Sequence, residues 1–207
     1  MARCLAISGS LRRESLNGTL LRALPALAPE GLEFDFFPGL GNLPLYNQDL
    51  DGDRPPGAVT ALREAIRAAD GLVLVTPEYL HGLPGVVKNA IDWASRPVTD
   101  PALTGKAVVV LVATTGRALG FRSRSDAVQL LTELCNVVVP APEVVLNSAQ
   151  DTLTREPDGT IRITDPMTEA LIRVQLHTLA DLIDSGAART LSASVRGHLA
   201  RFVTPPG

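Results

Sequence analysis

The chain has 207 residues, of which 45% are hydrophobic and 20% charged, and its formal net charge is −3. This balance is typical of one soluble globular domain, and it excludes the strong positive field of a protein that binds nucleic acid or an anionic membrane. No apolar run approaches the ~20 residues of a membrane span, and the N-terminus lacks the pattern of a signal peptide. We therefore expect a cytoplasmic protein with neither nucleic acid nor membrane as a partner.

The cysteines and histidines indicate no metal and no disulfide. Cys4 and Cys135 both fall in apparent strands, far apart in the chain, and we interpret them as buried, reduced side chains. The three histidines, His81, His177 and His198, share no metal-ligand spacing. We expect neither a structural nor a catalytic metal.

The first predicted strand covers residues 3–8, and the loop GSLRRESLN at residues 9–17 leads from it into a helix with a leucine stripe. Gly9 lets the backbone turn. Free N–H groups at the start of the helix carry the positive end of its dipole, so they can hold a phosphate, and Arg12 can add a charge-assisted contact. The alternative is that Ser15 only caps the helix and Arg12 is solvated, and the loop alone does not decide between the two.

The loop at residues 9–17 matches none of the common nucleotide or nucleophile motifs. It has neither the six-residue glycine pattern of dinucleotide-binding folds nor the P-loop pattern G-x-x-x-x-G-K. The sequence AISGS at residues 6–10 lacks the first glycine of the hydrolase pattern G-x-S-x-G, and no paired base is evident. A phosphate site without a second nucleotide-binding half favours a mononucleotide.

A short strand is predicted at residues 32–37 and a helix at residues 58–69, on opposite sides of a long irregular connection. This connection, residues 39–57, is rich in Gly, Pro, Asn and Asp. Connections of such length in a compact domain are usually functional or disordered.

The stretch GLVLVTPEYLHGLPGVVKNAIDW, residues 71–93, supplies a buried strand, an exposed loop and a helix in direct succession. Pro77 stops the strand because it has no N–H for the sheet, and Pro84 suits the first turn of the helix. Lys88 and Asp92 lie four residues apart and can pair on the helix surface. The loop therefore lies at the carboxyl edge of the sheet, where doubly wound folds bind ligands.

The remaining chain continues the alternation of strands and helices. The predicted elements are a strand at 106–113, a glycine-punctuated loop at 114–120, a helix at 123–134, a strand at 137–139 broken by prolines, a turn at 158–159 followed by a short strand at 160–164, and a closing helix at 168–185. The segment from residue 187 onward is assigned to no element, and we interpret it as a frayed terminus rather than as a docking segment.

Strands that alternate with helices imply right-handed crossovers and a parallel sheet. Five strands in a chain of this length fit a flavodoxin-like three-layer α/β sandwich with the strand order 2-1-3-4-5. Its switch point lies between the first and third strands, so the loops that follow those strands meet at one edge. We assign residues 1–186 to this domain and leave residues 187–207 as an unassigned C-terminal tail.

The two loops together resemble the NAD(P)H-dependent FMN reductase family, which includes flavodoxin-like quinone, azo-compound and chromate reductases. The resemblance rests on GSLRRESLN after the first strand and TPEY-(x)4-PG-(x)2-KNAIDW after the third, and it spans about residues 3–185. It implies an enzyme that passes hydride from NADPH or NADH through bound FMN to a quinone, azo compound, flavin or oxidised metal ion in a ping-pong cycle. No catalytic side chain is expected, because the cofactor carries the chemistry.

The resemblance also implies which residues bind the cofactor and the substrates. The residues expected to hold the FMN phosphate are Ser10, Arg12, Ser15, Leu16 and Asn17. Those expected along the ribityl chain and the isoalloxazine are Pro77, Glu78 and Tyr79, and those expected at the other edge of the flavin are Thr114, Thr115 and Gly116. Tyr79 and His81 are candidate modulators of the chemistry, and the candidate substrate contacts are His81, Arg117 and Phe121.

The sequence departs from the family at two places. Leu80 and His81 follow PEY, where the family usually has Asn, and Arg117 and Phe121 stand where more glycine is expected.

The family commonly forms dimers and often tetramers with the flavin near the subunit interface. The resemblance therefore implies a homodimer or homotetramer, with the helix at residues 83–94 at the interface. Arg117, Arg122 and Arg124 are candidates for the 2′-phosphate of NADPH, because Arg suits phosphate, and the alternative is that they are solvated surface residues.

Two other hypotheses about function stay open. An electron carrier like true flavodoxin is disfavoured by the 4% aromatic content and the small net charge. A non-catalytic flavin-binding protein is motivated by His81 and the altered glycine loop.

Overall fold

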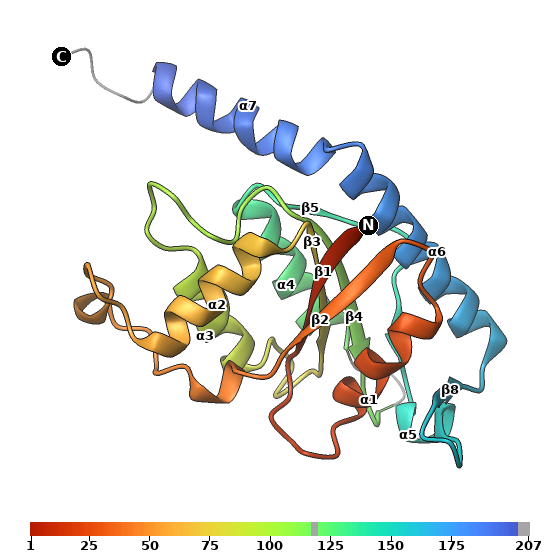
Figure 1. Ribbon diagram of the computed structural model, residues 1–207. Coiled ribbons are helices and arrows are strands. Elements are labelled where there is room, and N and C mark those ends of the chain that lie inside the picture. The colour runs from red at the N-terminus through yellow and green to blue at the C-terminus, as the bar shows by residue number, and fades with distance from the viewer. Residues whose placement is uncertain (117–119, 203–207) are drawn as a thin grey trace.

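Runs of apolar, often β-branched residues form the central strands, which pair in parallel in the order β2-β1-β3-β4-β5 (Figure 1). The computed structural model describes residues 1–116 and 120–202. The strands of this sheet are β1 Ala2–Ser8, β2 Leu32–Phe37, β3 Gly71–Thr76, β4 Ala107–Ala113, β5 Val137–Val138 and β6 Val145–Leu146. Every residue of β3 and β4 is buried, as expected of strands covered on both faces. The predicted strand order is confirmed.

The fifth position of the sheet is filled by two short strands rather than one. β5 pairs with the start of β4, where Val137 lies opposite Ala107, and β6 pairs with its end, where Val145 lies opposite Val112. Pro140 and Pro142 separate the two strands because proline cannot donate to the ladder. The prediction of the break is confirmed, whereas β6 was not predicted.

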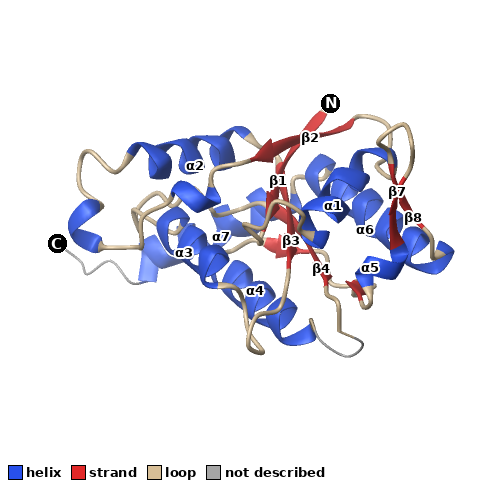
Figure 2. Cartoon of the chain, turned by 90° about the horizontal axis from the view of Figure 1, so that it is seen from below, coloured by secondary structure: helices blue, strands red, loops and turns tan. Residues whose placement is uncertain are grey.

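Helices cover both faces of the sheet (Figure 2). Within β3, Val73 and Val75 pack with one helical layer, and Leu72 and Leu74 pack with the other, because side chains alternate along a strand. The first layer contains α1 Leu16–Ala23 and α6 Pro166–Asp184, and the second contains α2 Gly57–Ala68, α3 Gly85–Ala94 and α4 Phe121–Glu133. The predicted three-layer sandwich is confirmed.

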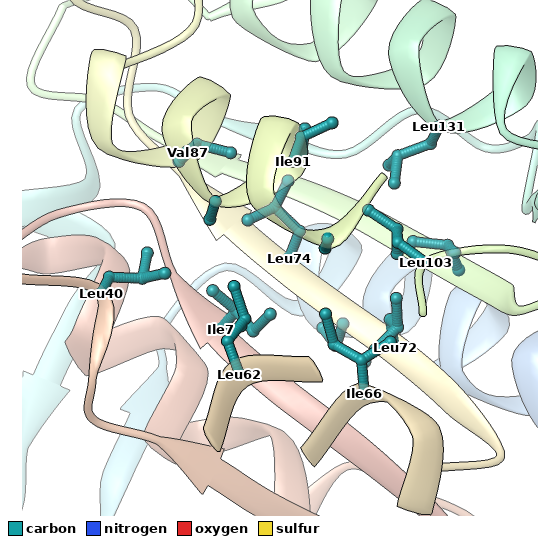
Figure 3. A pocket seen from close by; sticks show the side chains of 14 residues that line it. Ile7, Leu40, Leu62, Ile66, Leu72, Leu74, Val87, Ile91, Leu103 and Leu131 are labelled. Carbon is teal, nitrogen blue, oxygen red and sulfur yellow. The ribbon is translucent and has the colours of Figure 1, made fainter. Parts of the chain in front are cut away.

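The short elements lie in the connections. They are the 3-10 helices η1 Leu24–Ala26, η2 Leu40–Asn42 and η3 Gln48–Leu50, the single-turn helix α5 Ala149–Thr152, and the antiparallel hairpin of β7 Leu153–Arg155 and β8 Ile161–Ile163. The predicted turn at residues 158–159 lies in this hairpin. Between the sheet, α2 and α3 lies a cavity whose lining side chains, among them Leu62, Leu74 and Ile91, are all apolar (Figure 3). It offers no hydrogen-bonding group to a polar ligand.

The long connection at residues 39–57 is held in place by the KNAIDW motif of α3. The Asn89 Oδ1 accepts the Tyr46 N–H at 2.8 Å, and the Asn89 side chain donates to the Pro44 carbonyl at 2.9 Å. The buried Trp93 indole donates to the same carbonyl at 2.8 Å. Lys88 and Asp92 form the predicted surface pair, with 2.6 Å between Nζ and Oδ1. The motif therefore orders this connection.

Two predictions outside the central sheet are wrong. The segment after Gly186 is not frayed over residues 187–202, because it forms a helix, α7 Ala187–Phe202, in which Ala188 and Ser192 are buried. Cys135 is not in a strand but in a turn before β5, with a φ of 57°. Cys4 is buried in β1, and burial, followed by the charge of Asp70, raises its pKa to about 12. Both thiols are free, but Cys135 is only partly buried, whereas we expected both to be buried.

Among the described residues, no helix has the length and apolarity needed to cross a membrane. The same part of the chain contains no group of three or more His, Cys, Asp or Glu side chains placed to hold a metal ion.

Candidate functional site

The loops that follow β1, β3 and β4 converge on one pocket at the carboxyl edge of the sheet, the lower edge in Figure 1. Its lining residues are Ser10, Arg12, Ser15, Leu16, Asn17, Pro77, Glu78, Tyr79, Ala113, Thr114 and Thr115. Every predicted cofactor-binding residue except Gly116 lines this pocket. Ala113 was not predicted, because a buried alanine at the end of a strand carries no sequence signal of its own. The folded chain thus brings together the three loops that the sequence singled out.

One end of the pocket is the N-terminus of α1. Ser15 caps this helix, because its Oγ accepts the Gly18 N–H at 3.4 Å. The predicted capping role of Ser15 is therefore confirmed. Capping uses the oxygen as an acceptor and leaves the hydroxyl proton free to be donated. The N–H groups of Leu16 and Asn17, in the first turn, have no acceptor among the described residues. The cap is therefore observed and leaves donors for an anion at this end, whose binding stays a prediction.

Asn17 joins α1 to the sheet. Its buried side chain donates to the Ala113 carbonyl at 3.0 Å and accepts the Ala113 N–H at 3.1 Å. This pair of bonds fixes the start of α1 against the end of β4. Asn17 therefore offers an anion its backbone N–H, because its side-chain amide is bonded to the backbone of Ala113.

Gly9 is required by close packing. A Cβ at this position would lie 2.6 Å from the Thr76 Oγ1 and 2.8 Å from a methyl carbon of Val87. The Gly9 N–H also donates to the Val75 carbonyl at 2.8 Å, so the loop after β1 stays against β3 beyond the last paired residue. The chain does bend at Gly9, and the close approach of the two segments is the further reason that no side chain fits here.

Polar side chains from two loops meet above this helix end. The Ser10 Oγ lies 3.3 Å from the Tyr79 hydroxyl and 3.4 Å from the Arg12 backbone nitrogen, which donates to it. The exposed Arg12 guanidinium donates to the Glu14 carbonyl at 3.2 Å, which leaves most of its N–H groups for another partner. The first and third loops thus contact each other directly through Ser10 and Tyr79.

Glu78 directs its carboxylate toward α4. Its Oε2 accepts the backbone N–H groups of Gly120, Arg122 and Ser123 at 2.9, 3.1 and 3.2 Å, and its side chain is only 3% exposed. Burial alone would raise its pKa, but the three N–H donors and nearby His81 outweigh burial and lower the pKa below 4.5. Glu78 lines the pocket, yet its carboxylate oxygen Oε2 is hydrogen-bonded to the N-terminus of α4.

The loop after β3 ends in a tight two-residue turn. Tyr79 and Gly82 exchange two backbone hydrogen bonds of 3.1 Å each, while Leu80 and His81 have φ values of 45° and 60°. Such positive φ values favour Asn or Gly, so this turn carries backbone strain beside the pocket. The exposed His81 ring lies 3.6 Å from the Glu78 carboxylate and does not line the pocket. Its role as a modulator or substrate contact stays a prediction.

The other residues predicted to contact a substrate or the 2′-phosphate of NADPH do not line the pocket or are not described. Phe121 begins α4, is 54% exposed and lies outside the pocket lining. Arg117 lies outside the described residues. The hypothesis that Arg124 meets a 2′-phosphate is wrong, because this buried side chain pairs with Glu143 at 2.6 Å. Arg122 is exposed, and its role in binding NADPH stays a prediction.

Known proteins resemble the chain over most of its length. The sequence model of the NADPH-dependent FMN reductase family matches residues 2–151. An NAD(P)H-dependent FMN reductase of Pseudomonas aeruginosa is 40% identical over 177 residues, or 86% of this chain and 92% of that protein. A quinone reductase of Escherichia coli is 41% identical over 140 residues, or 67% of this chain and 74% of that protein.

A solved structure agrees with these sequence matches. The flavoenzyme FerB of Paracoccus denitrificans, an NAD(P)H:(acceptor) oxidoreductase, has a TM-score of 0.78 at 30% identity, covering 90% of this chain and 99% of that one. The resemblance inferred from the two loops is thereby confirmed, and the chain belongs to the NADPH-dependent FMN reductase family.

Proposed function

We propose that this protein is an FMN-dependent oxidoreductase that takes hydride from NADPH or NADH and reduces a quinone or another small acceptor at the same site. The observation that carries this proposal is one pocket in which an anion-binding helix N-terminus, a tyrosine and the end of a central strand lie together. The relatives named FMN reductase and quinone reductase support the reaction class.

The donor set at the end of α1 fits a phosphate monoester. The backbone N–H groups of Leu16 and Asn17, the hydroxyls of Ser10 and Ser15 and the Arg12 guanidinium all offer protons on this side of the pocket. The carboxylate in the lining, that of Glu78, faces three backbone N–H donors at the N-terminus of α4, which weaken its repulsion of an anion at α1. These residues would hold the FMN phosphate without further help.

The rest of the lining fits a planar ring system. Pro77 and Tyr79 offer flat apolar surface, and Ala113, Thr114 and Thr115 line the pocket from the end of β4. When bound, FMN supplies the centre that accepts hydride from NAD(P)H and then reduces the acceptor. The protein's part is to bind, orient and leave one face open, and the half-exposed Tyr79 lies at that opening.

We also propose that two copies associate around this pocket, as a homodimer or as part of a homotetramer. Large apolar side chains of the loops after β1 and β3 and of the start of α4 are exposed to solvent: Leu11, Tyr79, Leu80 and Phe121 are 58%, 50%, 99% and 54% exposed. A cytoplasmic location, with neither nucleic acid nor membrane as partner, remains our prediction, and the two free thiols fit a reducing compartment.

Flavin binding by two neighbouring arginine variants tests the proposed function. Arg12→Ala is expected to weaken FMN binding roughly tenfold, because it removes one charge-assisted contact at an exposed position. Arg13→Ala is the matched control, since Arg13 lies in the same loop, is exposed and does not line the pocket. Fluorescence titration of FMN measures both affinities. Equal affinity in the two variants, or wild-type protein that binds no FMN, would contradict the proposal.

A further inference from the structure

A second polar cleft lies at the amino edge of the sheet, opposite the flavin pocket. It is formed where α7 crosses the chain segments that lead into β3 and β4, at the upper edge in Figure 1. The side chains that matter in its lining are those of Asp70, Thr104, Lys106, Arg189, Ser192 and Arg196. None of them lines the pocket at the carboxyl edge.

The cleft concentrates positive charge in a protein whose formal net charge is −3. Lys106, Arg189 and Arg196 contribute three cationic side chains against the single carboxylate of Asp70. That carboxylate is already engaged, since its Oδ2 accepts the backbone N–H of Arg3 at 3.0 Å. The helix α7 itself carries three arginines and no acidic residue. The cleft therefore carries three cations against one carboxylate.

The guanidinium groups in the cleft keep most of their donors unused. The Arg189 side chain is exposed and makes no hydrogen bond or ion pair within residues 1–116 and 120–202. Arg196 makes one hydrogen bond there, from Nη2 to the Thr99 carbonyl at 3.2 Å. A planar guanidinium with free N–H groups binds phosphate oxygens in a bidentate manner.

The pKa of Lys106 is affected by the positive charges around it. Its Nζ donates to the Ala69 carbonyl, so the ammonium is held at the floor of the cleft. Partial burial lowers the pKa of Lys106, Asp70 opposes that shift, and the positive charges of Arg189 and Arg67 lower the pKa further. An anion between these groups would relieve the repulsion.

We propose that this cleft binds a small anion with a diphosphate group, held by Arg189 and Arg196 and completed by Lys106. Two guanidinium forks match two phosphate groups, whereas a single phosphate would leave one fork unpaired. The hydroxyls of Thr104 and Ser192, whose oxygens lie 3.3 Å apart, form a polar wall beside the anion. This site is separate from the proposed redox function, because it lies at the opposite edge of the sheet.

Calorimetric titration with inorganic pyrophosphate tests the cleft. The protein is first saturated with FMN, so that the phosphate site at α1 is filled, and ionic strength is held constant. Saturable binding of one pyrophosphate per chain is expected, and Arg189→Ala and Arg196→Ala should each weaken it by at least about tenfold. Arg201→Ala is the matched control, because Arg201 lies on the same helix and does not line the cleft. An ADP titration separates nucleotides from free diphosphate, since tighter binding of ADP assigns the site to a nucleotide.

Three outcomes would overturn the proposal: no saturable binding of pyrophosphate or ADP, equal weakening by Arg189→Ala and Arg201→Ala, or competition between pyrophosphate and FMN. The third outcome would assign the anion to the flavin pocket instead. Circular dichroism of each variant verifies that α7 remains helical, so that a loss of binding reports the missing guanidinium. If FMN itself does not bind, the same titration and variants still test the cleft, because its residues lie outside the flavin pocket.

Discussion

At the scale of single residues, membership of the pocket was predictable, but the direction of each side chain was not. Glu78 belongs to the PEY motif and lines the pocket, yet its carboxylate caps α4. The Asn17 side-chain amide likewise hydrogen-bonds to the backbone of Ala113 in β4. A sequence pattern specifies which loop a residue occupies, whereas these orientations depend on backbone groups of elements far along the chain.

The charge of Glu78 is expected to stabilise the fold. Because Glu78→Gln keeps an oxygen acceptor but removes the charge from three N–H donors, it should lower the free energy of unfolding by about 1–3 kcal/mol at neutral pH. Burial opposes the lowered pKa of Glu78, while the three N–H donors and His81 produce it. A folded-state pKa below the unfolded value means that this stabilisation is present above pH 4.5 and is lost as pH falls through the folded-state pKa.

Urea unfolding at neutral and acidic pH measures this effect. Glu64→Gln is the control, because Glu64 is an exposed carboxylate on α2. A difference between wild type and Glu78→Gln that does not shrink in acid would rule out the charge as the cause.

At the scale of elements, most of the secondary structure followed from apolar periodicity and from proline and glycine positions. The strands β1 to β4 and the helices α2, α3 and α6 lie within about two residues of their predictions. β6 was missed because two residues leave no periodic signal. α7 was missed because few of its side chains are buried, so its sequence lacks the broad apolar stripe of a core helix.

The KNAIDW motif gives a prediction at this scale. Asn89→Ala removes both hydrogen bonds to the connection at residues 39–57, so the Tyr46 amide loses its acceptor and should exchange with solvent faster. Hydrogen exchange read by mass spectrometry should show faster exchange confined to residues near 44–46. Lys88→Ala, which removes only a surface ion pair from the same helix, should leave this exchange unchanged. Unchanged exchange in Asn89→Ala would contradict this role of Asn89 and leave the connection to Trp93 and to Arg63, which pairs with Asp51.

At the scale of the whole molecule, the two edges of the parallel sheet carry different kinds of side chains. The carboxyl edge carries the loops of the proposed flavin pocket and a rim of exposed apolar side chains, while the amino edge carries Lys106 and the cations Arg189 and Arg196 of α7. The strand order alone predicted the first edge, because it places the switch point between β1 and β3. The second edge depends on α7, which the sequence patterns did not predict.

The apolar rim predicts self-association. Leu80→Ser should shift the protein toward monomer, because it removes the most exposed of these large side chains from the proposed interface. Light scattering coupled to size exclusion measures the mass. Val98→Ser is the control, since Val98 is 69% exposed but lies in the chain segment that contacts α7 at the other edge. A wild-type monomer, or equal masses of the two variants, would contradict the proposed association.

The most direct test of the redox account is an anaerobic titration of the FMN-loaded protein, first with NADPH or NADH and then with a quinone. We predict that the visible flavin absorbance is lost in proportion to the nucleotide added and returns in proportion to the quinone. Protein that retains bound FMN but keeps its absorbance with both nucleotides would contradict the account.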